Sequence, residues 1–464
     1  MRDATTDDQL STLPTIGKTV ERAVAAQAAF EPWAEPRVDD LLYAIAECIA
    51  EHAEALAATT VAETGLGNVA DKTLKNLVAS RTIQRGLAGK PGTGLLRVDA
   101  RRNVAEVASP VGVVFGLVPQ TNPVATFVFK VLIALKARNA LILSCHRGAQ
   151  GVCDQTGELI AAVLRRHRAP RGLVQWLRDR TDRETTLQFM RHPAVALILA
   201  TGGAGMVRAA YSSGTPAIGV GPGNAPAWVC ADSDPDAAAR CVVASKSFDN
   251  GIICASEHNL VVDSAVRGRF VAALQQHGAA LVGTDDVPRV LDALFDLDAG
   301  RLRPEAVGQP AARLAQLAGL RLPDTTRLVV VPAEPAQLQG PLGREKLAPV
   351  VSLFTVADEE EGFAVCRQIL SNDGRGHTAI IHSADEARIR RFGLEMPASR
   401  ILVNVPGVQG TLGIGTGLQP SMTLGCGTFG GTSTTDGVTY THLSNIKRIA
   451  YGATLSGDGA EKAA

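Results

Sequence analysis

The stretch Val111-Gly112-Val113-Val114-Phe115-Gly116-Leu117-Val118 is a continuous apolar run, and Pro119-Gln120-Thr121-Asn122-Pro123 ends it. Apolar strands without polar alternation are typical of parallel sheets that are buried on both faces. Helical and strand patterns then alternate along the chain, at 124–137, 140–143, 149–167, 173–177, 183–191 and 196–200. This alternation predicts an α/β fold with a doubly wound, nucleotide-binding sheet.

Two segments that follow predicted strands are candidate binding elements. Thr201-Gly202-Gly203-Ala204-Gly205 lies between a strand and a helix at 206–211, where bare backbone lets a pyrophosphate approach the helix N-terminus. The alternative is a tight turn, because the six-residue spacing of the common dinucleotide fingerprint is missing. Asn122 can present its amide to a reacting oxyanion, or it can satisfy the backbone of its own turn.

A second α/β run begins past Pro226 and contains a cysteine in a distinctive setting. In Ser245-Lys246-Ser247-Phe248-Asp249-Asn250-Gly251-Ile252-Ile253-Cys254-Ala255-Ser256-Glu257, the thiol follows an Asp-Asn-Gly turn and precedes an apolar strand. Strands are expected at 259–263, 327–331 and 378–382, and helices near 265–277 and 384–394. We hypothesise that Cys254 is a nucleophile, although most isolated cysteines are small core residues.

The composition excludes several classes of partner. The 464 residues carry 46 basic and 46 acidic side chains and only 4% aromatic residues, so neither nucleic acid nor a membrane surface is expected to bind. The start of the chain has no apolar signal core, and no apolar run approaches ~18 residues. Eight cysteines without Cys-x-x-Cys spacing predict no metal site and a reducing, cytoplasmic location.

Both ends of the chain carry further predicted elements. An amphipathic helix is expected from Ile16 to Phe30, either packed on the domain or docking to a partner or a protein shell. Alternating apolar residues predict a hairpin near 95–108. A last strand is expected from Ile446 to Tyr451.

The chain resembles the CoA-acylating branch of the aldehyde dehydrogenase superfamily from about residue 105 to about 450. Motifs that occur in the same order carry this resemblance: Pro119–Pro123, Leu197–Gly203, Ala209–Gly214, Ala217–Asn224, Phe248–Glu257, Glu345–Pro349, Gly376–Thr378, Arg400–Asn404 and Leu424–Gly427.

The resemblance implies an aldehyde dehydrogenase-like fold with two Rossmann-type parallel-sheet domains and an oligomerisation hairpin. We expect an NAD(P)-binding domain at 1–227, a catalytic cysteine domain at 228–420 and a C-terminal return at 421–464. The superfamily pairs subunits through the hairpin and the last strand, so a homodimer or homotetramer is expected.

The resemblance also implies a reaction in two half-reactions. The Cys254 thiolate attacks an aldehyde, and the resulting oxygen is held by the Asn122 amide and the Cys254 N–H. Hydride passes to NAD or NADP, and coenzyme A then removes the acyl group from Cys254. His377 is expected to move the CoA thiol proton, or else to be a hydrogen-bonded histidine at a strand end.

Acyl transfer to a thiol is favoured over hydrolysis by a missing base. The glutamate that activates water in hydrolytic members aligns with Val220, so the thioester would survive until coenzyme A arrives. A non-catalytic scaffold is disfavoured because Cys254, Asn122 and Glu345 are all present. The family pattern assigns cofactor binding to Ser144, His146, Arg147, Thr201, Gly202, Gly203 and Glu345.

Neither the cofactor nor the aldehyde is decided by the sequence. No carboxylate occupies Ser144-Cys145-His146-Arg147 to repel a 2′-phosphate, and Arg147 can pair with one, so NADP is permitted beside NAD. The tail Thr439–Tyr451 resembles that of enzymes for acidic aldehydes such as succinic semialdehyde and sulfoacetaldehyde. Acetaldehyde or propionaldehyde is the alternative.

Overall fold

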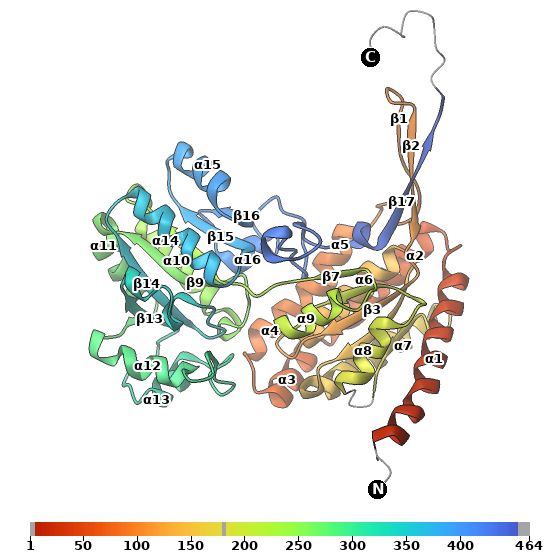
Figure 1. Cartoon of the computed structure of the whole chain (residues 1–464), viewed down its shortest axis with the longest axis horizontal. Coiled ribbons are helices and arrows are strands. Elements are labelled where there is room, and N and C mark those ends of the chain that lie inside the picture. Colours follow the sequence, from red (N-terminus) through yellow and green to blue (C-terminus); the bar gives the residue numbers. More distant parts are fainter. Residues whose placement is uncertain (1–4, 179–181, 453–464) are drawn as a thin grey trace, which may run out of the picture.

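The computed structural model describes residues 5–178 and 182–452. It has two α/β lobes side by side, and a three-stranded antiparallel arm projects away from both of them (Figure 1). Within the described residues no helix is both long enough and apolar enough to cross a membrane. The arrangement confirms the predicted fold class of two parallel-sheet units and a hairpin.

The first lobe is built on a five-stranded parallel sheet in the order β5-β4-β3-β6-β7. Its strands are β3 (Val113–Val118), β4 (Ala140–Cys145), β5 (Val174–Trp176), β6 (Val195–Ala200) and β7 (Ala217–Gly219). All residues of β3 and β4 are buried, as the unbroken apolar runs predict. The order reverses between β3 and β6, and the carboxyl ends of strands at such a switch point form the usual ligand crevice.

The helices of this lobe confirm most of the expected pattern. They are α1 (Thr5–Phe30), α2 (Glu35–Glu51), α3 (Ala53–Thr64), α4 (Val69–Leu77), a π-helical turn η1 (Val78–Thr82), α5 (Ile83–Leu87), α6 (Pro123–Lys136), α7 (Gln150–Arg166), α8 (Arg183–Arg191) and α9 (Ala204–Tyr211). Helix α1 begins earlier than the expected Ile16. Its apolar face, which includes Val20 and Phe30, is buried in the core of this lobe.

The second lobe holds a seven-stranded parallel sheet in the order β10-β13-β14-β9-β8-β15-β16. Its strands are β8 (Ala225–Val229), β9 (Glu257–Asp263), β10 (Ala279–Leu281), β13 (Leu328–Ala333), β14 (Val350–Val356), β15 (Gly376–His382) and β16 (Ala398–Val403). Successive residues point to opposite faces, so Trp228 and Val261 enter one core while Ala227 and Leu260 enter another. Strand β8 spans the predicted domain boundary at 227/228.

The remaining elements of the second lobe cover this sheet. They are α10 (Pro235–Lys246), α11 (Ser264–Gln276), α12 (Val287–Leu294), the short strands β11 (Phe295–Asp296) and β12 (Arg301–Leu302), α13 (Ala311–Leu317), α14 (Glu359–Asn372), α15 (Glu386–Glu395) and α16 (Gly407–Thr411). The strands and helices expected at 259–277, 327–331 and 378–394 are confirmed, while the sheet strands β8, β10, β14 and β16 are additional to them.

The arm consists of β1 (Gly94–Asp99), β2 (Val104–Pro110) and β17 (Ser444–Ala450). Strand β2 pairs antiparallel with β1 on one side and with β17 on the other, which confirms the predicted hairpin and last strand. Large apolar side chains on it face solvent, among them Leu95, Val98 and Ile449.

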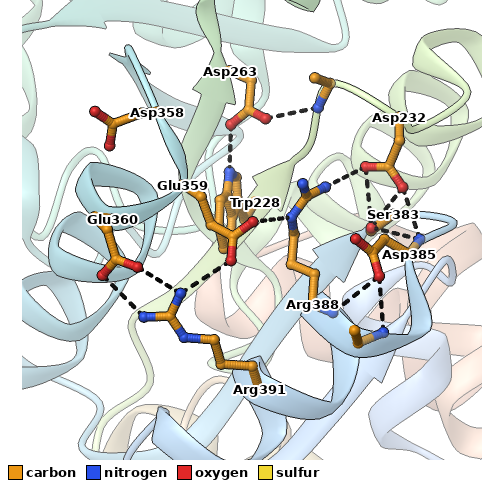
Figure 2. A network of polar contacts seen from close by, with 12 residues as sticks. Trp228, Asp232, Asp263, Asp358, Glu359, Glu360, Ser383, Asp385, Arg388 and Arg391 are labelled. Atoms are coloured by element: carbon orange, nitrogen blue, oxygen red, sulfur yellow. Dashed lines mark hydrogen bonds and ion pairs between the residues drawn. The ribbon is translucent and has the colours of Figure 1, made fainter.

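Ion pairs cross-link the elements around the switch point of the second sheet, between β8 and β15 (Figure 2). Asp232, just past β8, accepts hydrogen bonds from the Ala384 and Asp385 N–H groups at 2.7 and 2.8 Å and pairs with Arg388 at 2.5 Å. Arg388 also binds Glu359 at 2.9 Å, and Glu359 binds Arg391 at 3.0 Å. This carboxyl edge is therefore cross-linked from β8 to α14 and α15.

Replacing Arg388 by methionine should destabilise the second lobe. The change removes two charge-assisted bonds and leaves the half-buried Asp232 carboxylate without its cation, which should cost about 1–2 kcal/mol. The matched control is Arg390→Met on the same helix, because Arg390 is 74% exposed and reaches Glu386 only at 3.8 Å. Thermal unfolding measures both variants, and equal losses would contradict a stabilising role for the network.

Candidate active site

A cavity of about 430 Å³ lies where the two lobes meet. Its walls come from the carboxyl ends of β3 and β6 in the first lobe and from segments that precede or begin β9 and β15 in the second. The lining residues are Lys75, Pro119, Gln120, Thr121, Asn122, Thr126, His146, Thr201, Gly202, Gly203, Ala204, Val220, Gly221, Pro222, Ile252, Ile253, Cys254, Glu345, Leu347, His377, Leu412, Met422 and Leu424. Eight of the ten residues predicted for catalysis and cofactor binding are among them, and the two that are missing are Ser144 and Arg147.

Cys254 is held by a backbone of unusual conformation. The preceding turn places Asp249 and Asn250 at φ of 48° and 54°, a left-handed region that is costly for residues with a Cβ. On the other side Gly223 lies so close that an added Cβ would be 1.8 Å from the Cys254 carbonyl oxygen. The thiol is therefore fixed in place before any ligand arrives.

His377 faces this thiol. Its Nε2 lies 3.2 Å from Cys254 Sγ, and its Nδ1 lies 3.0 Å from Thr378 Oγ1. When Nδ1–H donates to the threonine hydroxyl, Nε2 carries the lone pair that can accept the thiol proton. The pairing of a cysteine with a base in hydrogen-bond reach is the arrangement of an activated nucleophile.

Burial keeps both partners neutral. It raises the pKa of Cys254 to about 12, with the Glu345 carboxylate and Cys426 adding to the rise and Arg400 opposing it. It also lowers the pKa of His377 to about 3, with Arg400 acting in the same direction. A thiol and a neutral imidazole are the resting forms, so the negative charge must appear only as the sulfur bonds to a substrate.

Arg400 is a buried cation behind the pair. It is 6% exposed, and its guanidinium donates to the carbonyl oxygens of His377 and Gly425 at 2.8 and 2.7 Å. Its Nε is buried and forms no hydrogen bond to a nitrogen or oxygen atom of the residues that the structure describes. Arg400 belongs to the Arg400–Asn404 motif, and nothing in its local sequence pattern indicates that it binds the backbone of His377.

Asn122 caps the start of α6 directly after β3 and lines the cavity. Its carboxamide oxygen accepts a hydrogen bond from Lys75 Nζ on α4, and the same ammonium binds Asp249 in the turn that precedes Cys254. Sequence reasoning missed Lys75. The one available signal was Lys72 and Lys75 at helical spacing i, i+3, which also fits an ordinary solvated face.

A second buried histidine, His258, contacts the backbone of Cys254. His258 Nε2 lies 3.2 Å from the Cys254 carbonyl oxygen, and its Nδ1 lies 3.0 Å from Lys246 Nζ. The Lys346 backbone N–H, which can only donate, also lies 3.0 Å from Nδ1, so Nδ1 accepts and Nε2–H donates to the carbonyl. Burial lowers the pKa of Lys246 to about 7. This group was not predicted either.

The segment after β6 fits a nicotinamide cofactor. Thr201 Oγ1 is buried and has no hydrogen-bond partner among the described residues, and Gly203 at the N-cap of α9 has no side chain to bind the first N–H groups of the helix. A Cβ added to Gly203 would meet no atom within 4 Å, so there is open space for a pyrophosphate beside the helix start.

Other predicted cofactor residues differ in position. Glu345 lines the cavity, accepts a hydrogen bond from the Gly223 N–H at 3.0 Å, and has its pKa raised to about 7 by burial. His146 also lines the cavity. Ser144 and Arg147 lie on the same segment but are not among its lining residues, so their contacts with the cofactor stay a prediction. In the described ranges no three His, Cys, Asp or Glu side chains gather as metal ligands.

Comparisons with known proteins agree with this geometry. A family model described as the aldehyde dehydrogenase family matches residues 3–291. The succinate-semialdehyde dehydrogenase (acetylating) of Clostridium kluyveri is 34% identical over 436 residues, which cover 94% of this chain and 95% of that protein. The chain belongs to the aldehyde dehydrogenase family. The resemblance seen in the sequence is confirmed.

Other relatives match over most of this chain. The crystal structure of an acetylating aldehyde dehydrogenase from Geobacillus thermoglucosidasius has a TM-score of 0.92 and 38% identity, and covers 98% of this chain and 99% of that one. The bifunctional aldehyde-alcohol dehydrogenase of Escherichia coli is 38% identical over 440 residues, 93% of this chain. The chain spans about half of that protein, 49% of its length.

Alkylation of Cys254 should depend steeply on pH. With its pKa near 12, the thiolate fraction of the free enzyme should rise about tenfold per pH unit, without a plateau, between pH 7 and 10. Peptide mapping after timed iodoacetamide treatment measures this rate at Cys254 alone, and Cys254→Ser shows the background at other cysteines. A plateau below pH 9 would contradict the neutral resting state.

Proposed function

We propose that this chain oxidises an aldehyde to an acyl-CoA, with NAD or NADP as hydride acceptor, through a thioester on Cys254. The observation that supports this most directly is the thiol 3.2 Å from the His377 Nε2 in a cavity that Asn122 and the Thr201–Gly203 segment also line. The acyl-transfer step should be readily reversible, because the Cys254 thioester is consumed and the CoA thioester is formed.

The first half-reaction uses Cys254, His377 and Asn122. As Sγ bonds to the aldehyde carbon, the thiol proton moves to His377 Nε2 and the negative charge moves to the substrate oxygen. The Asn122 NH₂ and the Cys254 N–H stabilise that oxygen. A bound nicotinamide would supply the acceptor for the hydride that leaves the substrate carbon, and Cys254 would be left as a thioester. The proton on His377 Nε2 would then pass to solvent, which returns the imidazole to its neutral form for the second half-reaction.

The second half-reaction transfers the acyl group to coenzyme A. The CoA thiol attacks the Cys254 thioester, its proton passes to His377, and the proton then returns to the departing Cys254 sulfur. Because the imidazole is neutral above about pH 3, it can accept that proton throughout the physiological range.

Val220 supports acyl transfer over hydrolysis. It lines the cavity at the position where hydrolytic members are expected to carry a base. Glu345 is the one carboxylate among the described lining residues, and a hydrogen bond from the Gly223 N–H holds it. A water molecule near the thioester therefore has no free carboxylate at the Val220 position to activate it.

We propose that the first lobe binds the cofactor and the second carries the nucleophile, with 421–464 returning to the first lobe as an oligomerisation segment. The exposed apolar side chains of the arm support pairing with a second copy of this chain as a homodimer or homotetramer.

Docking of α1 to a protein shell would need a face of the helix other than the buried one. Eight free thiols support a cytoplasmic location.

The cavity favours an uncharged, short aldehyde. Its walls include Ile252, Leu347 and Met422, and the only described lysine or arginine in its lining is Lys75, whose ammonium is already bound by Asp249 and Asn122. The relatives named for succinate semialdehyde and sulfoacetaldehyde keep the acidic aldehyde as the alternative.

Reduction of NAD or NADP should require coenzyme A for multiple turnovers. Without it, absorbance at the reduced-cofactor band should stop after a burst equal to the enzyme concentration, since the acyl group stays on Cys254. Cys254→Ser should lose at least about 10³-fold in turnover while still binding cofactor. Continuous turnover without coenzyme A would refute acyl transfer.

A Val220→Glu variant is the matched gain-of-function control for this assay. If the missing base explains thioester survival, the variant should release free acid slowly without coenzyme A. Val220→Gln has a similar size and no basic carboxylate, so it should not.

Propionaldehyde should be a better substrate than succinic semialdehyde. We expect kcat/KM to differ by at least about tenfold, because burying an unpaired carboxylate costs free energy while burying an apolar chain end releases it. Initial rates with both aldehydes at saturating cofactor and coenzyme A measure the ratio. A preference for the acidic aldehyde would show that a cation reaches the bound substrate.

A further inference from the structure

The proposed oxyanion donor has two chemically different ends. The carboxamide of Asn122 carries an NH₂ that can donate to a developing oxyanion and an oxygen that would repel it. The two ends have nearly the same size, so packing alone does not choose between them. Something in the site must select the orientation that presents the NH₂.

Lys75 makes this selection by its chemistry. Its Nζ contacts Asn122 Oδ1, and an ammonium can donate but cannot accept, so only the oxygen end of the amide can face it. The NH₂ is then directed away from Lys75, and its one hydrogen bond within the described chain is a long one, 3.4 Å, to Thr121 Oγ1. The amide therefore keeps donor capacity for a ligand.

The ammonium of Lys75 is itself held in place. It contacts Asp249 Oδ2, which also accepts from Lys72 Nζ at 3.0 Å, and the other oxygen of Asp249 accepts from the Asn68 N–H at 2.9 Å. All three charged side chains are buried, with exposures of 3% or less. One carboxylate thus binds two buried lysines, and such a hydrogen-bonded buried cluster leaves little freedom to its members.

Lys72 provides a comparison within the same cluster. It lies one helical turn from Lys75 on α4, shares the Asp249 carboxylate, and donates to the Thr121 carbonyl oxygen at 3.1 Å. No hydrogen bond joins it to Asn122 in the described structure. Loss of Lys72 should thus disturb the cluster without releasing the amide.

We propose that Lys75 is a positioning residue that orients the Asn122 carboxamide, so that its NH₂ faces the oxygen of the Cys254 thiohemiacetal. This inference rests on the proposed function and adds a residue to it. Lys75 acts through Asn122 and does not touch the substrate. The competing role, a cation that receives the acid group of an acidic aldehyde, would require Lys75 to leave Asn122.

A double-mutant cycle tests the inference. We expect Lys75→Met to slow the single-turnover burst of reduced cofactor, formed without coenzyme A, by about 10²-fold, because one oxyanion donor is typically worth 10²–10³. Asn122→Ala should slow it to a similar degree. If Lys75 works through Asn122, adding Lys75→Met to Asn122→Ala should cost less than about threefold more.

Matched variants separate this role from folding. Lys72→Met should slow the burst by less than about fivefold although it loses the same ion pair, and Lys75→Arg, which keeps a donor, should recover part of the Lys75→Met loss. Burst amplitude and Cys254 alkylation report whether the site is intact. If Lys75→Met fails to fold, the comparison of Lys75→Arg with and without Asn122→Ala still gives the coupling.

Three outcomes would overturn the inference. They are losses from Lys75→Met and Asn122→Ala that multiply in the double variant, equal losses from Lys72→Met and Lys75→Met, and a Lys75→Met loss confined to acidic aldehydes. Failure of the proposed function would be visible separately, because wild-type enzyme would then show no cofactor burst with any aldehyde.

Discussion

The carboxylate of Asp249 is shared by two buried lysines, and the site depends on this interaction. Asp249 belongs to the turn before Cys254, Lys72 and Lys75 belong to α4, and Asn122 follows β3, so one charge cluster joins three segments of the two lobes. Gly67 permits the contact, because a Cβ there would lie 1.9 Å from Asp249 Oδ1. A buried carboxylate must be paired, and here its partners connect the turn before Cys254, the proposed nucleophile, to Asn122, the proposed oxyanion donor.

The two sheets contribute opposite edges to the cavity. The first sheet offers its carboxyl edge at the β3/β6 switch point, where α/β proteins bind ligands, while the second offers the segments that lead into β9 and β15. At the switch point of the second sheet, the Asp232–Arg388–Glu359 network cross-links the surrounding elements (Figure 2). The same architecture thus serves as a binding surface in one lobe and as a cross-linked support in the other.

Local patterns predicted much of the fold, since apolar runs mark buried strands and α8 lies at its expected 183–191. Strand β8 was not predicted, because Pro226 weakens the sequence pattern of a strand. In the structure, the register of the β8–β9 pairing shifts at this proline. Cys254, Asn122 and His377 could be selected from motifs. Lys75 and Arg400 could not, because the role of a lysine 174 positions from Asp249 exists only once the chain has folded.

The pairing of β2 with β17 has a consequence for synthesis on the ribosome. Ser109 and Asn445, which are neighbours in the arm, are 336 positions apart in the chain. At ~5–20 residues per second the outer edge of β2 stays without its partner for roughly 20–70 s after it emerges. An unpaired edge strand invites pairing with other nascent chains, and Glu106 on β2, with Arg97 opposite it on β1, places charge on this strand. Strand β17 therefore completes a sheet whose other two strands, β1 and β2, are translated long before it.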